Sequence, residues 1–244
     1  MGSFANVVIH RVPRRISIVT PRSRCPCCLT ELSWTDNIPL VSWLTLKGKC
    51  RHCDKPISPR YPLVELINAA LWAAVFGYFG VSWQLAPMLV FVTVLVIVSA
   101  TDIDLKIIPN RVMLPASLIA IVLIALADIF GSDVSATGAL AGAALYGLPM
   151  LALALAIPAG MGIGDVKLAG YLGLHLGALS LPNVLVGALS GFFLGGVTGV
   201  VLIALGLRGR KDPVPFGPFM AGGALLAVFA GEAIIRAWIF ASFG

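Results

Sequence analysis

Charged residues are scarce in this sequence. Only 11% of the 244 residues are Asp, Glu, Lys or Arg, whereas soluble domains usually contain about 25%. Cysteine is also sparse, with five residues in the whole chain, which excludes a disulfide-rich miniprotein. Hydrophobic residues make up 59%. This composition excludes a disordered chain, a collagen-like chain and nearly every soluble enzyme, and it leaves a polytopic membrane protein.

Long apolar runs fill the chain from residue 62 onward. A membrane-spanning helix needs about 20 residues to cross about 30 Å of hydrocarbon. Seven runs approach that length, over residues 62–80, 83–103, 112–130, 137–158, 166–180, 184–207 and 217–240. The fifth is short and glycine-rich, which is typical of a helix that is tilted, broken or buried among its neighbours. The sequence therefore predicts an all-α membrane protein with about seven transmembrane helices.

Basic residues indicate how these runs are oriented. Ten of the 17 Lys and Arg residues lie in the first 60 residues. If residues 1–61 are cytoplasmic and each run crosses once, six later basic residues also fall inside, namely Lys106, Arg111, Lys167, Arg208, Arg210 and Lys211. Only Arg236 falls toward the outer side, so the pattern follows the positive-inside rule. Because the charge lies between apolar runs and not on the face of a soluble domain, we expect no nucleic-acid partner.

Four of the five cysteines form two C-x2-C pairs. Cys25 and Cys28 are separated by 21 residues from Cys50 and Cys53, close to the spacing of a zinc ribbon. Two residues between thiolates let one tight turn bring both sulfurs to one metal, and two such turns complete a tetrahedral site with no open position. The alternative is a pair of disulfides, which a cytoplasmic location disfavours. We therefore expect a structural zinc ion, with Cys27 left over.

Acidic residues are rare after residue 61. They are Glu65, Asp102, Asp104, Asp128, Asp133, Asp165, Asp212 and Glu232. A carboxylate inside a membrane costs about 2.5–3.5 kcal/mol on insertion scales, so a function is the default interpretation for those within apolar runs. Asp128, Asp133 and Asp212 fall at loop edges, where we expect them to meet water.

Two aspartates are expected at the same depth. Asp102 closes the second run in VSATDIDLKIIPN, and Asp165 opens the fifth in MGIGDVKLAG. The second run descends to the cytoplasmic side and the fifth leaves from it, so both carboxyls should lie near the inner face. Two carboxyls that meet can share one proton, since like charges repel. Such a pair can hydrolyse a peptide bond by general acid–base catalysis, without a covalent intermediate or a catalytic metal.

The neighbours of these aspartates suggest supporting roles. Gly162 and Gly164 precede Asp165, and we expect them to supply backbone angles closed to other residues and room for a substrate strand. Asp104 follows Asp102 by two positions, so on a helix it faces about 200° away and cannot easily replace it. The alternative interpretation is structural, with Asp102 and Asp104 solvating a helix end and Asp165 favouring a helix N-terminus through the dipole.

The chain resembles the type IV prepilin peptidases, bacterial membrane aspartyl proteases that process prepilins and pseudopilins. The resemblance runs over nearly the whole length, through GSFANVVIHRVP, the cysteine pairs, DNIPLVSWLTLKGKCRHC, ISPRYPLVEL, DIDLKIIPN, GMGIGDVKL and PFGPFMAGGA. A GxGD element alone is modestly specific. Together with the cysteine pairs and an upstream D-x6-P segment, it is highly specific.

The resemblance implies a catalytic pair made by Asp102, seven residues before Pro109, and Asp165 of the GxGD element. It implies removal of a short basic leader just after a glycine, at the cytoplasmic face of the bacterial inner membrane. Members with the cysteine pairs also resemble N-methyltransferases that use S-adenosylmethionine, although this chain has no Gly-rich nucleotide loop. The matched motifs mark seven supporting residues, namely Gly162, Gly164, Lys167, Asp104, Pro109, Asn110 and Glu65. No role for Glu65 follows from the sequence.

Two parts of the chain are expected to differ in character. Residues 1–61 should form the cytoplasmic zinc-binding module, and residues 62–244 the transmembrane peptidase domain. The family pattern normally has a transmembrane helix before GSF-x-N, whereas this chain begins with Met1-Gly2-Ser3-Phe4. We therefore expect seven helices instead of eight, with residues 2–9 as the remnant of the first, and no secretion signal.

Two other functions are compatible with parts of the pattern. A proton-coupled transporter would use intramembrane carboxylates, but such folds usually place their sites near the midplane between inverted repeats, and no clear internal repeat is visible. A membrane-anchored zinc module that only binds a partner would leave Asp102 and the GIGD segment without a purpose. A prepilin peptidase would account for the intramembrane carboxylates, the cysteine pairs and the GIGD segment together.

Overall fold

The described part of the chain is almost entirely helical. The computed structural model describes residues 2–33, 35–131, 133–157, 161–209, 212 and 214–243. Its long helices are α3 (Arg60–Phe79), α4 (Leu85–Leu105), α5 (Asn110–Ile129), α6 (Ala136–Ala156), α7 (Ile163–Leu179), α8 (Leu181–Ala204) and α9 (Gly217–Phe243). The shorter helices are α1 (Gly2–Arg11), η1 (Thr35–Asn37) and α2 (Val41–Thr45). The prediction of an all-α protein is confirmed.

Six helices in the described part are long and apolar enough to cross a membrane. They are α3, α4, α5, α6, α8 and α9. The fifth predicted run forms α7, which has only 17 residues and so measures about 25 Å. From Leu168 to Ala178 nearly every residue of α7 is buried, which agrees with a helix enclosed by its neighbours. Of the predicted elements, Pro158 at the end of the fourth run and the basic residues Arg210 and Lys211 lie outside the described residues.

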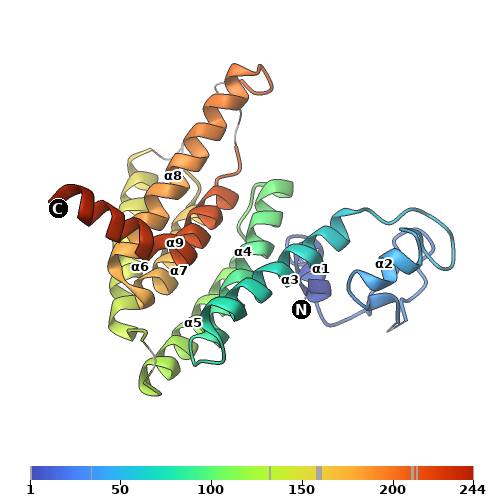
Figure 1. Ribbon diagram of the computed structural model, residues 1–244. Coiled ribbons are helices and arrows are strands. Elements are labelled where there is room, and N and C mark those ends of the chain that lie inside the picture. Colours follow the sequence, from blue (N-terminus) through green and yellow to red (C-terminus); the bar gives the residue numbers. More distant parts are fainter. Residues whose placement is uncertain are drawn as a thin grey trace.

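Two antiparallel helix pairs pack through glycine. Helices α6 and α7 lie side by side, as do α8 and α9 (Figure 1). A Cβ added to Gly142 would lie 2.4 Å from the carbonyl oxygen of Gly173, and one added to Gly223 would lie 2.4 Å from the carbonyl oxygen of Gly187. Small residues at helix crossings let backbones approach closely in membranes. Close helix packing therefore explains the glycines at these two crossings.

The centre of the bundle is formed by α4 and α7. The ring of Phe91 on α4 stacks on His175 of α7 with 4.4 Å between centroids, and both residues are fully buried. The indole N–H of Trp72 on α3 donates to the hydroxyl of Thr93 on α4 at 2.9 Å. The ring contact joins α4 to α7, the two helices that carry Asp102 and Asp165, and the hydrogen bond joins α3 to α4.

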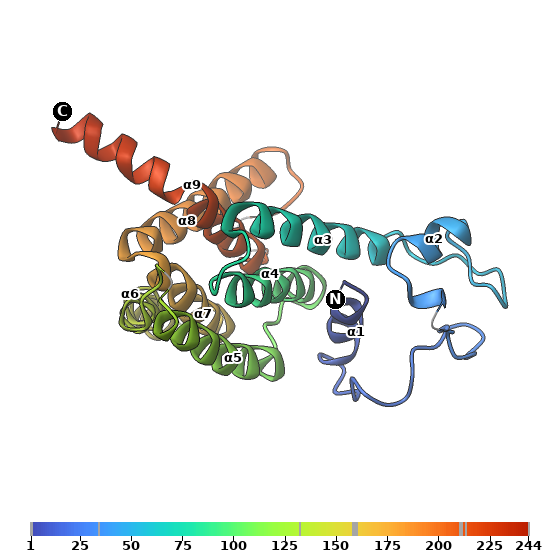
Figure 2. The same cartoon turned by 60° about the horizontal axis from the view of Figure 1, so that its bottom comes forward.

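The cysteine-bearing segment lies to one side of the bundle. Helix α1 packs against α3 and α4, and the segment containing α2 extends beyond the first turn of α3 (Figures 1 and 2). The residues expected to be the remnant of a first helix thus form α1, which is joined to the bundle core by Ala5, Val8 and Ile9.

Candidate active site

Asp102 is enclosed at the end of α4. Only 5% of its surface is exposed, and its Oδ2 accepts a hydrogen bond of 2.8 Å from the backbone N–H of Gly217, the first residue of α9. The first N–H groups of a helix have no partner within the helix and lie at the positive end of its dipole, so a helix N-terminus is a favourable neighbour for a carboxylate. A Cβ at residue 217 would lie 2.9 Å from the same oxygen, so this contact requires glycine.

Asp165 lies in the first turn of α7 and is half-buried. Its N–H donates to the carbonyl oxygen of Gly162 at 3.0 Å. The carboxyl of Asp102 is near enough to act on it electrostatically. Side chains from α4 and α7 therefore converge, although the two aspartates are 63 positions apart in the sequence. Two neighbouring carboxyls can exchange protons with a water molecule and a peptide carbonyl.

Tyr146 on α6 is a further neighbour of Asp165. It is 3% exposed and interacts electrostatically with that carboxyl. Its hydroxyl has no hydrogen-bond partner among the described residues. Tyr146 could not be identified from the sequence, because a tyrosine within an apolar run is typical of core packing. Gly217 was also missed, although PFGPFMAGGA was among the matched segments.

The expected role of the two glycines before Asp165 is wrong in one respect. Gly162 has φ of −76° and Gly164 lies within α7 without a positive φ, so neither uses backbone angles closed to other residues. What Gly164 provides is space, because an added Cβ would lie 3.1 Å from Cβ of Ile108 in the segment after α4. The close approach of α7 to that segment therefore favours glycine at this position.

Three of the supporting residues meet beside the aspartates. Pro109 precedes α5, and Asn110 begins it. The Nζ of Lys167 on α7 donates to Oδ1 of Asn110 at 2.6 Å. This bond ties the helix that carries Asp165 to the segment that follows Asp102.

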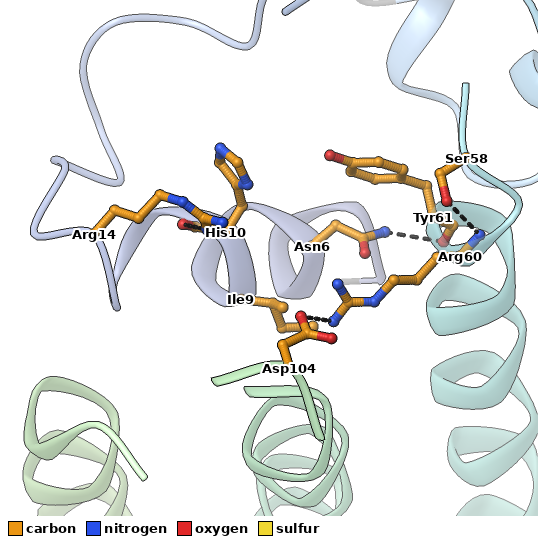
Figure 3. Close-up of a pocket in the computed structure, with 8 residues that line it drawn as sticks. All are labelled: Asn6, Ile9, His10, Arg14, Ser58, Arg60, Tyr61 and Asp104. Atoms are coloured by element: carbon orange, nitrogen blue, oxygen red, sulfur yellow. Dashed lines mark hydrogen bonds and ion pairs between the residues drawn. The ribbon is translucent and has the colours of Figure 1, made fainter. Parts of the chain in front are cut away.

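Asp104 points away from the pair, as the helical spacing predicts. It forms an ion pair with Arg60 at the start of α3, which Figure 3 draws together with the pocket around it. The two aspartates of α4 thus serve different neighbours. Asp102 contacts α9, and Asp104 contacts α3.

Glu65 connects the N-terminal segment to the bundle. From α3 its carboxylate accepts hydrogen bonds from the hydroxyl of Ser3 on α1 and, at 2.9 Å, from the N–H of Leu40 just before α2. Leu40 has φ of 60°, a backbone angle that is uncommon for a non-glycine residue. The carboxylate is thus the link that holds the start of α2 against the membrane helices.

The four paired cysteines form one cluster. The Sγ atoms of Cys25, Cys28, Cys50 and Cys53 all lie within 4.8 Å of one another. Sγ of Cys25 and Sγ of Cys53 are 3.8 Å apart, which is the edge of a tetrahedron with metal–sulfur bonds of about 2.3 Å. Disulfide sulfurs would be about 2.05 Å apart, and all five cysteines are free thiols. Cys27 is exposed and outside the cluster, and His52 is exposed.

The two cysteine turns repeat the same backbone pattern. In the first, the N–H of Leu29 donates to the carbonyl oxygen of Cys25, and Leu29 has φ of 59°. In the second, the N–H of Asp54 donates to the carbonyl oxygen of Cys50, and Asp54 has φ of 53°. Each turn is also closed by an antiparallel bridge, Arg24 with Glu31 and Lys49 with Pro56. This internal symmetry directs two pairs of sulfurs at one point.

The thiols of Cys28 and Cys53 differ in pKa because their surroundings differ. Bonds with the hydroxyl and backbone of Thr30 lower the pKa of the Cys28 thiol to about 6. For Cys53 a bond with the backbone of Lys55 favours the thiolate, but desolvation and the three neighbouring thiols raise its pKa to about 12. At neutral pH the metal-free cluster therefore contains at least one thiolate, the form in which cysteine binds a metal.

An ion pair between Arg51 and the enclosed carboxylate of Asp36 supports the second cysteine turn. Nη2 of Arg51 lies 2.9 Å from Oδ1 of Asp36 in η1, and the side chain of Asp36 is only 4% exposed. Burial opposes ionisation of this carboxyl, but hydrogen bonds from Ser33 and Arg51 outweigh it and hold the pKa below its usual value. The pair fixes η1 to the residue that follows Cys50.

Two protein-family models match this chain, one after the other along the sequence. A family model described as the bacterial peptidase A24 N-terminal domain matches residues 1–79, and one described as the type IV leader peptidase family matches residues 89–202. Asp102 and Asp165 both lie in the second range. No solved structure matches the chain significantly.

Several similar proteins carry the name prepilin leader peptidase/N-methyltransferase. The one from Bacillus subtilis is 36% identical over 249 residues, which cover 100% of this chain and 96% of that protein. Those from Aeromonas hydrophila and Pseudomonas aeruginosa are 35% and 34% identical, and each alignment covers 100% of this chain and 91% of the relative. With this identity and coverage, and with both family models matched in order, the chain belongs to the type IV leader peptidase family.

Proposed function

We propose that the protein is a membrane aspartic endopeptidase that removes the leader from type IV prepilins or pseudopilins, with Asp102 and Asp165 as its catalytic pair. The observation that carries this proposal is the convergence of these two carboxyls from α4 and α7. The shared name of the relatives supports the substrate class.

The reaction is hydrolysis by a pair of carboxyls. One carboxylate takes a proton from a water molecule while the water oxygen bonds to the carbonyl carbon of the scissile peptide. The other carboxyl, which is protonated, donates to the carbonyl oxygen. The tetrahedral intermediate then collapses, the C–N bond breaks, and the leaving amine takes a proton from the pair. Water is thereby divided between a new carboxyl group and a new amine.

The distribution of basic residues supports a cytoplasmic position for this chemistry. Lys106, Arg111 and Lys167 lie within a few residues of the aspartates, and basic residues mark the inner side of membrane proteins. We therefore assign the protein to the bacterial inner membrane, with cleavage after a glycine where the basic leader meets the substrate's apolar helix. The bond between Lys167 and Asn110, together with Pro109, would keep α5 and α7 in register at this end.

The test is leader cleavage by conservative variants of the two aspartates. We expect Asp102→Asn and Asp165→Asn each to reduce cleavage of a purified prepilin by at least a thousandfold while the protein inserts and purifies normally. Asp128→Asn is the matched control, because Asp128 lies at the other end of α5, where its Oδ2 accepts the N–H of Ala136 at 3.1 Å, and asparagine keeps an acceptor. Near-normal cleavage by either active-site variant would refute the role of that residue.

The cysteine cluster is proposed to hold a structural zinc ion. Four thiolates at tetrahedral spacing leave no position for a substrate, and a metal would let residues 1–61 fold with little apolar core of their own. We propose that this cytoplasmic module and the membrane-embedded part, residues 62–244, are the two functional parts of the chain. Metal analysis of the purified protein should give one zinc ion per chain, and Cys28→Ser should lose it.

We propose N-methylation as a second activity, because the relatives are also named N-methyltransferases. N-methylation of the new N-terminus would use S-adenosylmethionine, whose sulfonium supplies an electrophilic methyl group. The chain offers a polar pocket with carboxylate and guanidinium groups beside α4, which suits the charged amino-acid end of that cofactor. Mass spectrometry of the cleaved product with and without S-adenosylmethionine tests this activity independently of cleavage.

A further inference from the structure

A pocket of about 250 Å³ lies where α1, α3 and the end of α4 meet. Figure 3 shows its lining, in which Arg60 reaches from the start of α3 toward Asp104 of α4, and His10 and Arg14 lie along α1 and the segment after it. Asn6 and Tyr61 complete the polar wall. The pocket is built from three elements distant in sequence, and none of its residues belongs to the Asp102–Asp165 pair.

Donors and acceptors remain available in this pocket. Arg14 uses Nη1 to bond the carbonyl oxygen of His10 at 2.7 Å, and a guanidinium has five N–H donors in all. The buried Asn6 uses its amide nitrogen to bond the carbonyl oxygen of Tyr61 at 3.0 Å, and its amide oxygen is an acceptor. Asp104 contributes a carboxylate. The pocket can therefore both donate to an anionic group and accept from a cationic one.

This mixture of charges selects the class of ligand. Arg60 and Asp104 form an ion pair inside the pocket, so a ligand beside them meets a positive and a negative group together. An α-amino acid group carries a carboxylate and an ammonium side by side and matches both signs. Small-molecule pockets are usually about 300–1,000 Å³, so the space here suits an amino-acid end, with a larger remainder projecting past the ring of Tyr61, which is 43% exposed.

The position of the pocket connects it to the cleavage site. Seven of its eight lining residues lie within residues 1–79 and one, Asp104, lies within residues 89–202, so it bridges the two matched regions. Asp104 and Asp102 share the last turns of α4 on opposite faces. The amine released at Asp102 and Asp165 therefore forms about one helix diameter, roughly 10 Å, from the pocket.

We propose that this pocket binds the methionine part of S-adenosylmethionine, with Asp104 and Asn6 toward its ammonium and Arg14 and Arg60 toward its carboxylate. The proposal rests on the proposed methyl transfer. In that step the lone pair of the new N-terminal amine forms a bond to the methyl carbon. The methyl–sulfur bond breaks, its electron pair stays on sulfur, which becomes a neutral thioether, and the amine releases a proton to water.

The test is equilibrium binding of radiolabelled S-adenosylmethionine to the full chain in lipid nanodiscs. We expect saturable binding that S-adenosylhomocysteine displaces. Arg14→Gln and Asp104→Asn should each raise Kd at least tenfold, and Arg14→Lys should raise it less, since it keeps the charge. Asp165→Asn is the crossed control, because it should abolish cleavage and leave Kd unchanged. Melting temperature and metal content show which variants are folded.

A second measurement locates the ligand without substitutions. Ultraviolet crosslinking of S-adenosylmethionine to the wild-type chain should label peptides that contain His10–Arg14 or Ser58–Tyr61. Labelling elsewhere, or unchanged Kd in folded Arg14→Gln and Asp104→Asn, would overturn the pocket and leave methyl transfer standing. Absence of binding to the wild-type chain would overturn both, while its cleavage of prepilin would still support the peptidase. Displacement by anionic phospholipid but not by S-adenosylhomocysteine would mark a headgroup site and also refute the proposal.

Discussion

At the scale of single residues, the active site depends on one backbone N–H as well as on two carboxyls. Gly217 brings the N-terminus of α9 to Asp102 at 2.8 Å, and a Cβ there would lie 2.9 Å from Oδ2 and 3.3 Å from Cγ. Alanine at 217 must therefore displace the carboxyl from its place opposite Asp165. We expect Gly217→Ala to lower kcat for leader cleavage at least tenfold, because misplacing a catalytic group costs far more than the added methyl.

A glycine on the same helix provides the control for this substitution. A Cβ at Gly222 would meet only Cδ1 of Leu194, at 3.4 Å, which is an ordinary contact. Gly222→Ala should therefore cleave prepilin at the wild-type rate. If both variants lose activity equally, the effect belongs to packing of α9 and not to Asp102.

Substitution of two buried tyrosines can distinguish an effect on activity from an effect on stability. The hydroxyls of Tyr146 and Tyr171 both lack a hydrogen-bond partner among the described residues, and a buried unsatisfied hydroxyl costs stability. Phenylalanine at either position should leave stability unchanged or raise it by about 1 kcal/mol. Only Tyr146 neighbours Asp165, so Tyr146→Phe should lower kcat several-fold with little change in KM, whereas Tyr171→Phe should not. Equal activity of the two variants would contradict a role for Tyr146.

At the scale of helices, the site is held by glycine contacts between α6 and α7. A Cβ at Gly173 would lie 2.3 Å from the carbonyl oxygen of Gly142, whereas one at Gly170, a single turn earlier on α7, would meet nothing within 4 Å. Overpacking of this kind typically costs about 1–3 kcal/mol. We expect Gly173→Ala to lower the melting temperature and to reduce cleavage, since α7 carries Asp165. Gly170→Ala should change neither, and a matching loss there would show that α7 tolerates no substitution at all.

The helices could be predicted from the sequence more fully than their contacts. The pattern of hydrophobic runs predicted the six spanning helices, and the spacing of the cysteines predicted their cluster, because both depend on periodicity and spacing along the chain. The depth of the two aspartates in the membrane stays a prediction. The bond between Gly217 and Asp102 joins residues 115 positions apart, and no local pattern records it. A sequence cannot distinguish a glycine needed for its φ from one needed for space. At Gly164 the sequence therefore suggested unusual backbone angles, whereas the structure shows a close approach to Ile108. The role of Glu65 follows only from the structure, in which its carboxylate on α3 contacts both α1 and the start of α2.

At the scale of the whole molecule, the four clustered cysteines lie between two segments that line one pocket. Arg14 precedes Cys25 and Ser58 follows Cys53, so the cysteine cluster closes the loop that connects them, while Glu65 fixes the start of α2 to α3. The aspartate pair is formed by α4, α7 and α9, outside this loop. Metal bound at the cysteines should therefore order the pocket more strongly than the cleavage site.

Removal of the metal tests this division. After chelation under reducing conditions, we expect prepilin cleavage to fall only several-fold, while the affinity for S-adenosylmethionine falls at least tenfold, because ordering residues 15–57 without metal adds an entropic cost to forming the pocket. Restoring zinc should recover both, whereas magnesium, which prefers oxygen ligands, should recover neither. A complete and irreversible loss of cleavage, with binding intact, would show that the cysteine module supports the aspartates and not the pocket.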